Sequence, residues 1–299
     1  MPGLNSNLHS NNFFNHNTLS SENINNILNR FVVKYYFLSL LIFFTLTFFS
    51  DCTYSQSPYN LETGREAIML GGGFGLGVLT LSLESNIDSL NFNELQNLSR
   101  KNVNAFDRGA TYNWSEDASI ISDYLLNFMI ISPVTLLTSD EVRNDFGTFS
   151  VMYLENLFLS FAAVHTTKIL IKRNRPYTYN KNVPKNHRSD KTSRLSFFSG
   201  HTTHAFSSAV FLSSVYAEYY PDSKWKTYIW GISLLSASLT GFLRYSSGDH
   251  FPTDIIVGAV VGSAIGYLVP LIHKVDKKDE SLVVKHPQYQ NLFSILLIF

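Results

Sequence analysis

Three short clusters in the second half of the sequence combine residue types that could do chemistry together. Between them they supply three fixed cations, two imidazoles, a carboxylate and a glycine-bearing turn, which is the set of groups that phosphoryl transfer through a histidine requires. The sequence therefore predicts hydrolysis of phosphate esters. In chain order the clusters are Lys168 with Arg175, then Ser199, Gly200 and His201, and then Arg244, His250 and Asp254.

Five of these residues could bind the phosphate. A phosphate monoester carries roughly two negative charges at neutral pH, and its transition state spreads that charge over the equatorial oxygens, so catalysis depends mostly on electrostatic stabilisation. Arg175 and Arg244 could donate paired hydrogen bonds, and Lys168 could supply a compact charge. Ser199 and Gly200 precede a predicted helix, whose free N–H groups would face the same anion.

The remaining three residues would carry the bond-making steps. Asp254 follows His250 at i+4 and could accept its Nδ1 proton, which leaves the Nε2 lone pair free to attack phosphorus. His201 would protonate the leaving alkoxide and then activate water. We expect no cofactor and no metal, because the sequence shows no carboxylate cluster suited to a magnesium pair and its single cysteine, Cys52, cannot form a thiolate zinc site.

The three clusters resemble the signature of the type 2 phosphatidic acid phosphatase and vanadium haloperoxidase superfamily, in particular its bacterial phosphatase branch. That signature reads Lys-x6-Arg-Pro, Pro-Ser-Gly-His and Ser-Arg-x5-His-x3-Asp, and all three spacings fit in the same order. A three-part match is far more specific than a lone short motif. The resemblance covers residues 118–273 and implies the same residue roles as the chemical argument above.

Two positions depart from the family pattern, and His250 has a charged neighbour. Phe198 stands where the family usually has proline, and Leu243 where it usually has serine; we interpret both as packing changes, since neither side chain takes part in the scheme. Asp249 directly precedes His250. If its carboxylate lies close to the imidazole, it would raise the pKa of His250.

Other polar residues have simpler interpretations. A single Lys, Arg or His is more commonly a solvated or capping residue, so the assignment depends on the joint occurrence of the clusters. The basic run from Lys172 to Arg194 could guide an anionic substrate or meet a lipid surface, or it could be a solvated loop. His204 could line the pocket. The histidines that we interpret as structural, hydrogen-bonded residues are His165, His204, His273 and His286.

The apolar segments predict an all-α fold, a bundle of about six helices with the active site at one end. No strand-like alternation or internal repeat competes with this interpretation. Successive helices alternate in direction, which brings the three clusters to the same end of the bundle. Glycines at four-residue intervals in the last segment, and closely spaced ones in the first, predict tight helix contacts. The segments are 67–83, 118–137, 149–171, 202–220, 229–243 and 255–272.

Composition and the terminal segments define the expected domains. The chain has 299 residues, is 45% hydrophobic and carries no formal net charge, which argues against a nucleic-acid binder. Residues 1–30 are an Asn- and Ser-rich tail that we expect to be disordered. Residues 31–57 carry a basic flank and an apolar run typical of a signal peptide or signal anchor. The helical domain would span 60–275, and 276–299 would form a C-terminal tail.

The chain is expected to be membrane-embedded, although its mean hydropathy of only +0.01 also allows a soluble periplasmic globule. In lipid, the polar residues Asp123, Asn127, Glu155, Asn156 and His165 would have to face the bundle interior. Lysines near 224–226 and 274–278 favour a bacterial-type inner-membrane protein whose site faces the periplasm. That orientation requires that an early segment, such as 67–83, does not cross.

Three classes of function remain open. The first is a metal-independent phosphatase acting on a lipid phosphate or pyrophosphate, such as phosphatidate or an isoprenoid diphosphate. The second is a soluble acid phosphatase of broad specificity. The third is a non-catalytic binder of an anion or lipid. Among enzymes, a vanadium haloperoxidase is a weaker alternative, because vanadate mimics phosphate in the same pocket. The sequence specifies neither the head group nor the oligomeric state.

Overall fold

The computed structural model describes residues 57–275, so the tail 1–30, nearly all of the predicted signal 31–57 and the tail 276–299 lie outside the described residues. Those three predictions therefore stay untested. The long helices are α2 (Thr63–Glu84), α5 (Glu116–Ile131), α7 (Phe146–Ile171), α9 (Gly200–Tyr219), α10 (Lys226–Ser246) and α11 (Pro252–His273). The short helices are α3 (Phe92–Asn97), α4 (Ala105–Arg108), α6 (Asp140–Asn144) and α8 (Lys185–Arg188).

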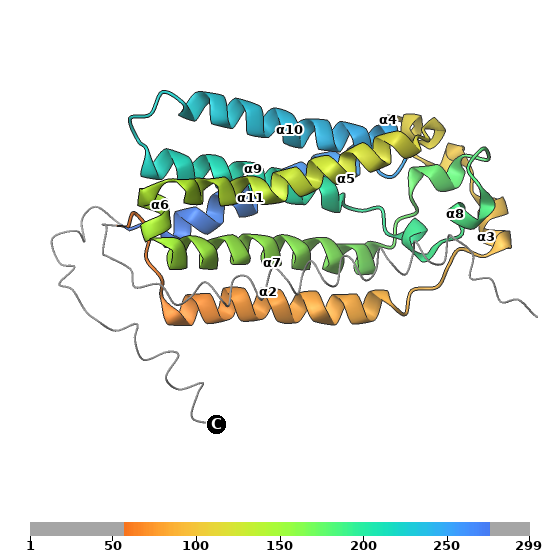
Figure 1. Cartoon of the computed structure of the whole chain (residues 1–299). Helices are drawn as coiled ribbons and strands as arrows, with labels where there is room; N and C mark the ends of the chain where they lie inside the picture. Colours follow the sequence, from red (N-terminus) through yellow and green to blue (C-terminus); the bar gives the residue numbers. More distant parts are fainter. Residues whose placement is uncertain (1–56, 276–299) are drawn as a thin grey trace, which may run out of the picture. The chain divides into compact units, whose positions relative to one another are not determined.

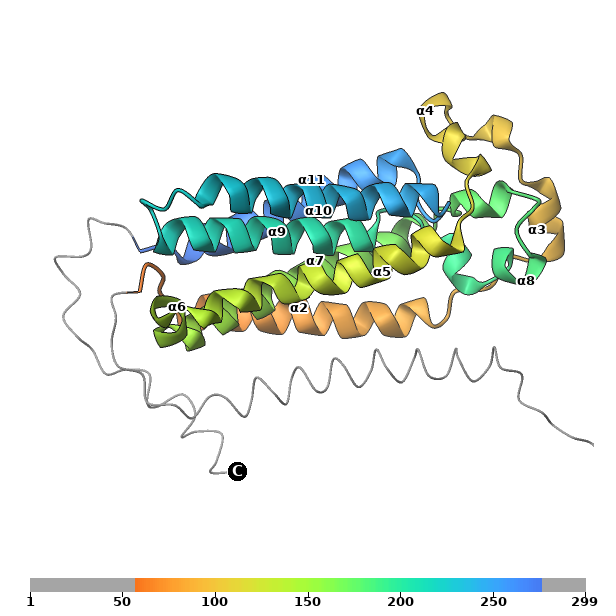
Figure 2. The same ribbon diagram turned by 45° about the horizontal axis from the view of Figure 1, so that its top comes forward.

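The six long helices lie side by side with alternating direction (Figure 1, Figure 2). Each corresponds to one of the six apolar segments, although segment 118–137 continues past α5 into a 3-10 helix, Ser132–Thr138, and segment 202–220 ends one residue past α9. No β-strand occurs within residues 57–275, so the all-α prediction is confirmed. An isolated antiparallel bridge joins Tyr59 to Lys274. It ties the start of the bundle to the end of its last helix.

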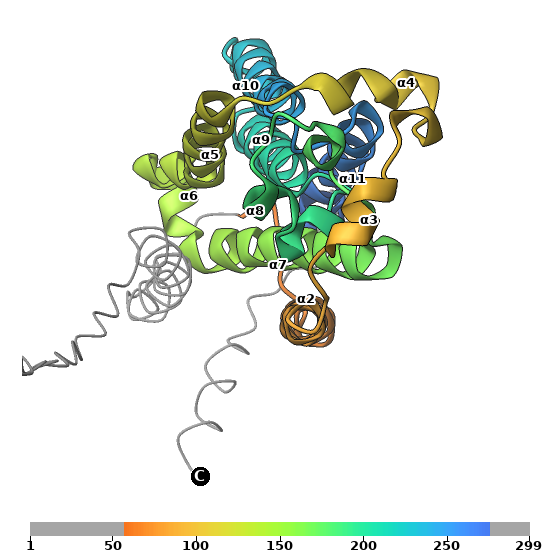
Figure 3. The same cartoon turned by 90° about the vertical axis from the view of Figure 1, so that its right-hand side faces the viewer.

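Two long connections cover one end of the bundle. The link from α2 to α5 carries α3 and α4, the link from α7 to α9 carries α8, and these short helices gather over the same end (Figure 3). α3 begins with a capping box between Asn91 and Glu94, in which each side chain accepts from the other residue's N–H. Lys172, with a φ of 47°, ends α7 in the left-handed conformation and turns the chain into the second connection.

Glycines set the distance between α9 and α11. An ideal Cβ on Gly262 would lie 2.2 Å from the carbonyl oxygen of Thr203, and one on Gly266 would lie 2.4 Å from that of Ser207. The backbones can approach this closely only without those side chains, as in membrane helix pairs. The predicted contact face of α11 is therefore present.

In α2, only part of the glycine-rich stretch serves this purpose. Gly73 and Gly77 face Phe158 and Phe161 of α7, whereas Gly71 and Gly75 have no atom within 4 Å of the Cβ position. The expectation of close helix contact is thus met by one face of α2. Through that face α2 packs along α7, and its axis is aligned with the axes of the other long helices.

The polar residues within apolar segments divide into two groups. Glu155 and Asn156 of α7 are fully buried and His165 is partly buried, in agreement with the sequence analysis. Asp123 and Asn127 of α5 are exposed, so the expectation that they face the bundle interior is wrong for both. Asp123 lies midway along α5, where it meets a histidine described below.

Within residues 57–275, four helical stretches are long and apolar enough to cross a membrane. They carry large exposed apolar side chains, such as Ile68 and Tyr124, which are 75% and 73% exposed. Apolar surface of this extent is typical of a lipid-facing helix rather than of a soluble globule. The stretches are Thr63–Glu84, Glu116–Thr138, Phe146–Tyr179 and Pro252–His273.

The close contact at Gly262 gives a test of the packing. We expect Gly262→Ala to destabilise the fold by about 1–3 kcal/mol, because the added methyl group overlaps a backbone carbonyl that cannot move alone. Gly231→Ala is the matched control, since Gly231 lies within α10 and has no atom within 4 Å of the Cβ position. It should be neutral or stabilising by up to about 1 kcal/mol. Equal thermal unfolding midpoints for both variants in detergent would contradict this packing.

Candidate active site

All eight predicted site residues lie at the covered end of the bundle, joined by a chain of contacts. Lys168 stands in the last turn of α7, Arg175 in the connection after it, and Ser199, Gly200 and His201 at the start of α9. Arg244 lies in the last turn of α10, followed by His250 in the turn and Asp254 in the first turn of α11. The alternation of helix direction therefore brings the three clusters together, as the sequence analysis expected.

Arg175 and Arg244 hold a carboxylate between them. Arg175 Nη1 lies 2.7 Å from Asp249 Oδ1, and Arg244 Nη2 lies 2.8 Å from Asp249 Oδ2. Two guanidinium groups aimed at the two oxygens of one anion form the arrangement that binds a phosphate. The Asp249 carboxylate therefore shows that the two guanidinium groups can bind one oxyanion together.

The charge of Asp249 is strongly stabilised. Burial alone would raise the pKa of its carboxyl group, but the guanidinium groups of Arg244 and Arg175 outweigh burial and hold that pKa well below its usual range. The Ser247 hydroxyl also donates to Asp249 Oδ2 at 2.6 Å. Asp249 therefore remains an anion at neutral pH, and a substrate phosphate must compete with it for the two arginines.

His250 is a buried and neutral imidazole. Its side chain is 1% exposed, and burial, followed by the positive charges of Arg175, Arg244 and Lys168, holds its pKa well below the ordinary value. The expected rise in its pKa from Asp249 is corrected here, because Asp249 faces the arginines and its effect is outweighed. A neutral imidazole keeps the lone pair that a nucleophile needs.

Asp254 lies beside His250 without a hydrogen bond to it. The distance from His250 Nδ1 to Asp254 Oδ2 is 3.6 Å, and Nδ1 has no hydrogen-bond partner among the described residues. Contacts of this kind often tighten only when substrate binds. Asp254 itself is fixed, since its Oδ2 accepts from the Phe251 N–H at 2.9 Å and from the Ser196 hydroxyl at 2.5 Å.

Arg173 forms an ion pair with Asp254. Arg173 Nη1 lies 2.5 Å from Asp254 Oδ1, and its Nη2 lies 2.7 Å from Asp107 Oδ2 in α4. Both carboxylates are fully buried, and the guanidinium also lies over the Phe251 ring at 4.0 Å from the centroid. Arg173 is thus a positioning residue that connects the first covering segment to the start of α11.

The N-terminus of α9 offers donors to the same region. Ser199 is the N-cap, its hydroxyl oxygen accepting from the Thr202 N–H, while its own N–H donates to the Asp254 carbonyl oxygen at 3.1 Å. The hydroxyl proton of Ser199 remains available to donate a hydrogen bond. Within residues 57–275, the N–H groups of Gly200 and His201 have no acceptor. A Cβ on Gly200 would lie 3.8 Å from Lys168 Nζ, which places the ammonium group at this helix end.

Helix α5 contributes residues that the sequence analysis did not assign to the site. Asp123 Oδ1 lies 2.7 Å from His201 Nε2 and 3.5 Å from Arg244 Nη1. The hydroxyl oxygens of Ser119 and Ser122 each lie 3.1 Å from Arg244 Nη1. These contacts hold the His201 imidazole and the Arg244 guanidinium in place.

The turn from α10 to α11 depends on one glycine. Gly248 has a φ of +80°, and a Cβ there would lie 2.3 Å from the Asn113 carbonyl oxygen. Its own carbonyl oxygen accepts from the Tyr177 N–H at 2.9 Å. Only glycine fits both the conformation and the space. The turn therefore points Asp249 toward the arginines and delivers His250 to the start of α11.

The sequence signals differ among the residues that were not assigned to the site. Arg173 falls within the basic run that was interpreted as a guide for anions or a solvated loop, while Asp107 and Asp123 are isolated carboxylates in segments without a motif. A sequence motif with fixed spacing identifies functional residues that lie on one helix or on two neighbouring helices. It does not find partners from a distant segment, which only the packing brings into contact.

The double ion pair of Arg173 yields a prediction for stability. We expect Arg173→Ala to destabilise the fold by about 3 kcal/mol, because two buried carboxylates would lose their shared cation. Lys181→Ala is the control, as Lys181 is an exposed cation of the same connection. Thermal unfolding of both variants in detergent measures the difference. A midpoint for Arg173→Ala equal to that of the control would show that the bridge does not hold this end together.

Comparisons with known proteins bear on these residues. The family model described as the PAP2 superfamily matches residues 149–278, a range that includes all eight predicted site residues and excludes Asp107 and Asp123. A comparison with curated proteins found no match.

Among solved structures, the chain is similar to the crystal structure of a transmembrane PAP2 type phosphatidylglycerolphosphate phosphatase from Bacillus subtilis. The identity is 20% and the TM-score 0.39, over 67% of this chain and 94% of the other. The family model confirms the resemblance seen in the three clusters. Residues 149–278 are therefore similar to the PAP2 superfamily.

Proposed function

We propose that this protein is a metal-independent phosphatase that hydrolyses phosphate monoesters or pyrophosphates through a phosphohistidine intermediate. The observation that carries the proposal is the Asp249 carboxylate held between Arg175 and Arg244, directly before a buried, neutral His250. An oxyanion site thus lies next to a group that can attack phosphorus. The guanidinium groups supply positive charge that a metal ion would otherwise provide.

The reaction follows in two steps. In the first, His250 Nε2 attacks phosphorus, the bond from phosphorus to the ester oxygen breaks, and His201 gives a proton to the departing alkoxide. In the second, His201 accepts a proton from water, whose oxygen attacks phosphorus and breaks the bond to His250. Inorganic phosphate leaves, and both histidines return to their starting protonation states.

Two positioning residues support this cycle. Asp254 would accept the Nδ1 proton of His250 as positive charge develops on the imidazole, once substrate binding shortens the present 3.6 Å separation. Asp123 holds the Nε2 atom of His201 at 2.7 Å. Its carboxylate would stabilise the protonated imidazole that donates in the first step, against burial and the charge of Arg244, which lower the pKa of His201.

The surroundings of His201 favour a lipid substrate. Its side chain is 26% exposed and that of Asp123 is 57% exposed, so this side of the site is reached from the flank of the bundle beside α5. That flank carries Ile120, Ile121 and Tyr124, all more than half exposed. An acyl or isoprenoid chain lying against these side chains would bring its phosphate to the site without leaving an apolar environment.

The alternatives make different demands on the molecule. A soluble acid phosphatase of broad specificity has no need of long helices with exposed apolar faces, and those faces favour a membrane-bound enzyme. A vanadium haloperoxidase would bind vanadate at the same arginines and should oxidise halide after vanadate loading. A non-catalytic anion binder would bind phosphate without turnover.

Substitution of the nucleophile tests the proposal. We expect His250→Ala to lose at least about 10³-fold in the rate of phosphate release, because no other group can form the phosphoenzyme. His187→Gln is the control, since that imidazole packs against Trp114 and Tyr177 outside the reacting groups. Wild-type release should continue during brief exposure to EDTA and stop with vanadate. Full activity in the His250→Ala variant would refute the phosphohistidine route.

A substrate panel would identify the substrate class. Purified protein in detergent would be offered phosphatidate, undecaprenyl diphosphate and a soluble aryl phosphate, with phosphate release measured as kcat/KM. A preference for either lipid supports access from the flank of α5. A preference for the aryl phosphate would favour the broad-specificity enzyme instead.

We also propose that the protein lies in a bacterial-type inner membrane with its active site facing the periplasm. Lys224, Lys226 and Lys274 lie at the end opposite the site, where positive charge favours the cytoplasm. Because α2 lies along α7 with the other long helices, this orientation places the start of α2 in the cytoplasm.

Single cysteines can test the orientation. In a Cys52→Ser background, a cysteine replacing Lys181 should react with a membrane-impermeant maleimide on intact spheroplasts. A cysteine replacing Lys224, which is equally exposed at the other end, should react only after the membrane is opened. The reverse pattern would place the active site in the cytoplasm. Reaction of both in intact spheroplasts would show that the bundle does not span the membrane.

A further inference from the structure

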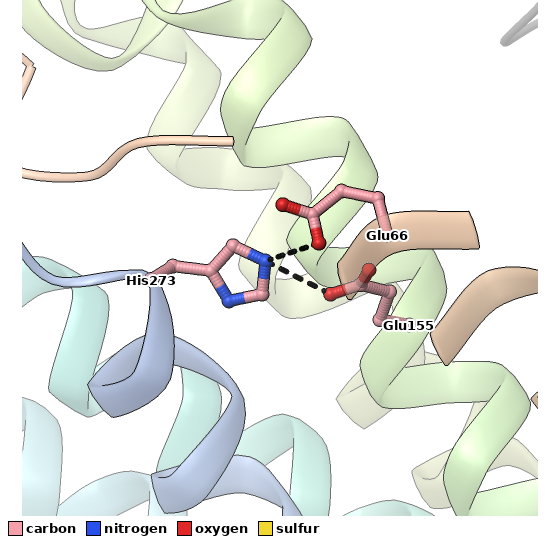
Figure 4. Close-up of side chains that lie close together, drawn as sticks. All are labelled: Glu66, Glu155 and His273. Carbon is pink, nitrogen blue, oxygen red and sulfur yellow. Dashed lines mark ion pairs between the residues drawn. The ribbon is translucent and has the colours of Figure 1, made fainter. Parts of the chain in front are cut away.

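A second cluster of ionisable side chains lies at the end of the bundle opposite the active site. Glu66 of α2, Glu155 of α7 and His273 of α11 point toward one another (Figure 4). His273 and Asp254 stand at opposite ends of α11, which places them about 28 Å apart along the helix. The cluster is therefore separate from the reacting histidines.

These three residues are buried and incompletely paired. Glu155 and His273 are fully buried, and Glu66 is 9% exposed. Within residues 57–275, neither carboxylate oxygen of Glu155 has a hydrogen-bond partner, and neither has Nε2 of His273. A carboxylate taken out of water is costly unless a cation or several donors compensate it. The protein thus buries a carboxyl group that is not fully compensated within the described residues.

The histidine tautomer is fixed by its surroundings. Nδ1 of His273 lies 2.7 Å from the Val269 carbonyl oxygen, which can only accept, so Nδ1 carries the proton. In the neutral ring, Nε2 then presents a lone pair toward two carboxylate oxygens, which repel it. A cation between them removes that repulsion. Donation of the second ring N–H to a backbone carbonyl is also the usual support for a metal-ligating histidine.

The spacing of the three ligand atoms suits a tetrahedral metal ion. Nε2 lies 3.1 Å from Glu155 Oε2 and 3.4 Å from Glu66 Oε2, and all three atoms lie within 4.8 Å of one another. Tetrahedral zinc with nitrogen and oxygen ligands holds those ligands about 3.3 Å apart. A histidine among the ligands favours zinc over magnesium or calcium, which prefer oxygen alone.

Glu66 is itself held by a second layer of contacts. Arg65 donates to both of its oxygens, at 2.8 Å and 3.1 Å, and the Glu62 N–H donates to Oε1 at 2.7 Å. Arg65 Nη1 also donates to the Ile272 carbonyl oxygen at 2.7 Å, next to His273. Outer contacts of this kind orient a ligating carboxylate. They compensate Glu66 but leave Glu155 and the Nε2 lone pair without a partner.

We propose that Glu66, Glu155 and His273 bind one Zn²⁺ ion that joins α2, α7 and α11 at this end of the bundle. Water takes the fourth position. The ion is structural: it lies far from the reacting phosphate, and it compensates a buried carboxylate where three helices meet. It does not alter the metal-independent chemistry at the other end. Its removal is expected to lower thermal stability before it affects turnover.

Metal analysis of the full-length protein tests the proposal. Protein purified in detergent without chelator, then dialysed against Zn²⁺ and freed of excess, should contain about one zinc ion per chain. His250→Ala should contain the same amount, because the ion does not bind at the catalytic histidines. Glu155→Gln and His273→Gln should lose most of it. His165→Gln is the control, a buried-face histidine paired with Glu84 at the other end.

A second measurement uses only the unmodified chain and so does not depend on whether the variants fold. After removal of metal by a chelator, Zn²⁺ should raise the thermal unfolding midpoint and Mg²⁺ should not. Wild-type protein that takes up no zinc would overturn the proposal and identify the cluster as a protonated histidine between two carboxylates. Equal zinc content in Glu155→Gln and wild type would also overturn it.

Discussion

The structure depends on holding several like charges together inside the end of a helical bundle. Lys168, Arg175 and Arg244 meet beside His250, and without buried anions they would repel one another and remain exposed to water. Asp249 sits between the two arginines and compensates them in the absence of substrate. In the proposed function, the same two arginines would bind a phosphate, so that a substrate oxyanion would take the place of the Asp249 carboxylate.

The rest of the fold keeps that arrangement in place. The glycine face of α11 lets its backbone lie against α9, which fixes the start of one helix relative to the start of the other. The connection from α2 to α5 supplies Asp107, and the connection from α7 to α9 supplies Arg173. Arg173 forms ion pairs with both Asp107 and Asp254. The catalytic groups stand at helix ends, where free N–H groups and rigid caps orient them. At the opposite end the helices meet around buried ionisable groups instead of open loops.

Much of this could be predicted from the sequence, for physical reasons. The chain reverses direction between successive long helices, so Lys168 and Arg244 were expected at the same end of the bundle. His250 and Asp254, four residues apart, were expected close together where the last helix begins. The glycine intervals of α11 likewise predicted a close contact. The spacing could not reveal Asp123, because no periodic pattern links a residue of α5 to His201 across 78 positions. Asp249 was identified as a charged neighbour of His250, but the direction of its side chain depends on the turn at Gly248. His273 was interpreted as a structural histidine, since its two glutamate neighbours come from distant helices.

Direct detection of the covalent intermediate tests the central claim. In the His201→Gln variant, a soluble aryl phosphate has a leaving group that needs no proton, so the first step should proceed while hydrolysis of the phosphoenzyme is slow. An alkaline quench followed by peptide mass spectrometry should then find phosphate on His250, with a burst of aryl alcohol matching the enzyme concentration. Phosphate on another residue, or steady turnover with no phosphorylated His250, would contradict the account.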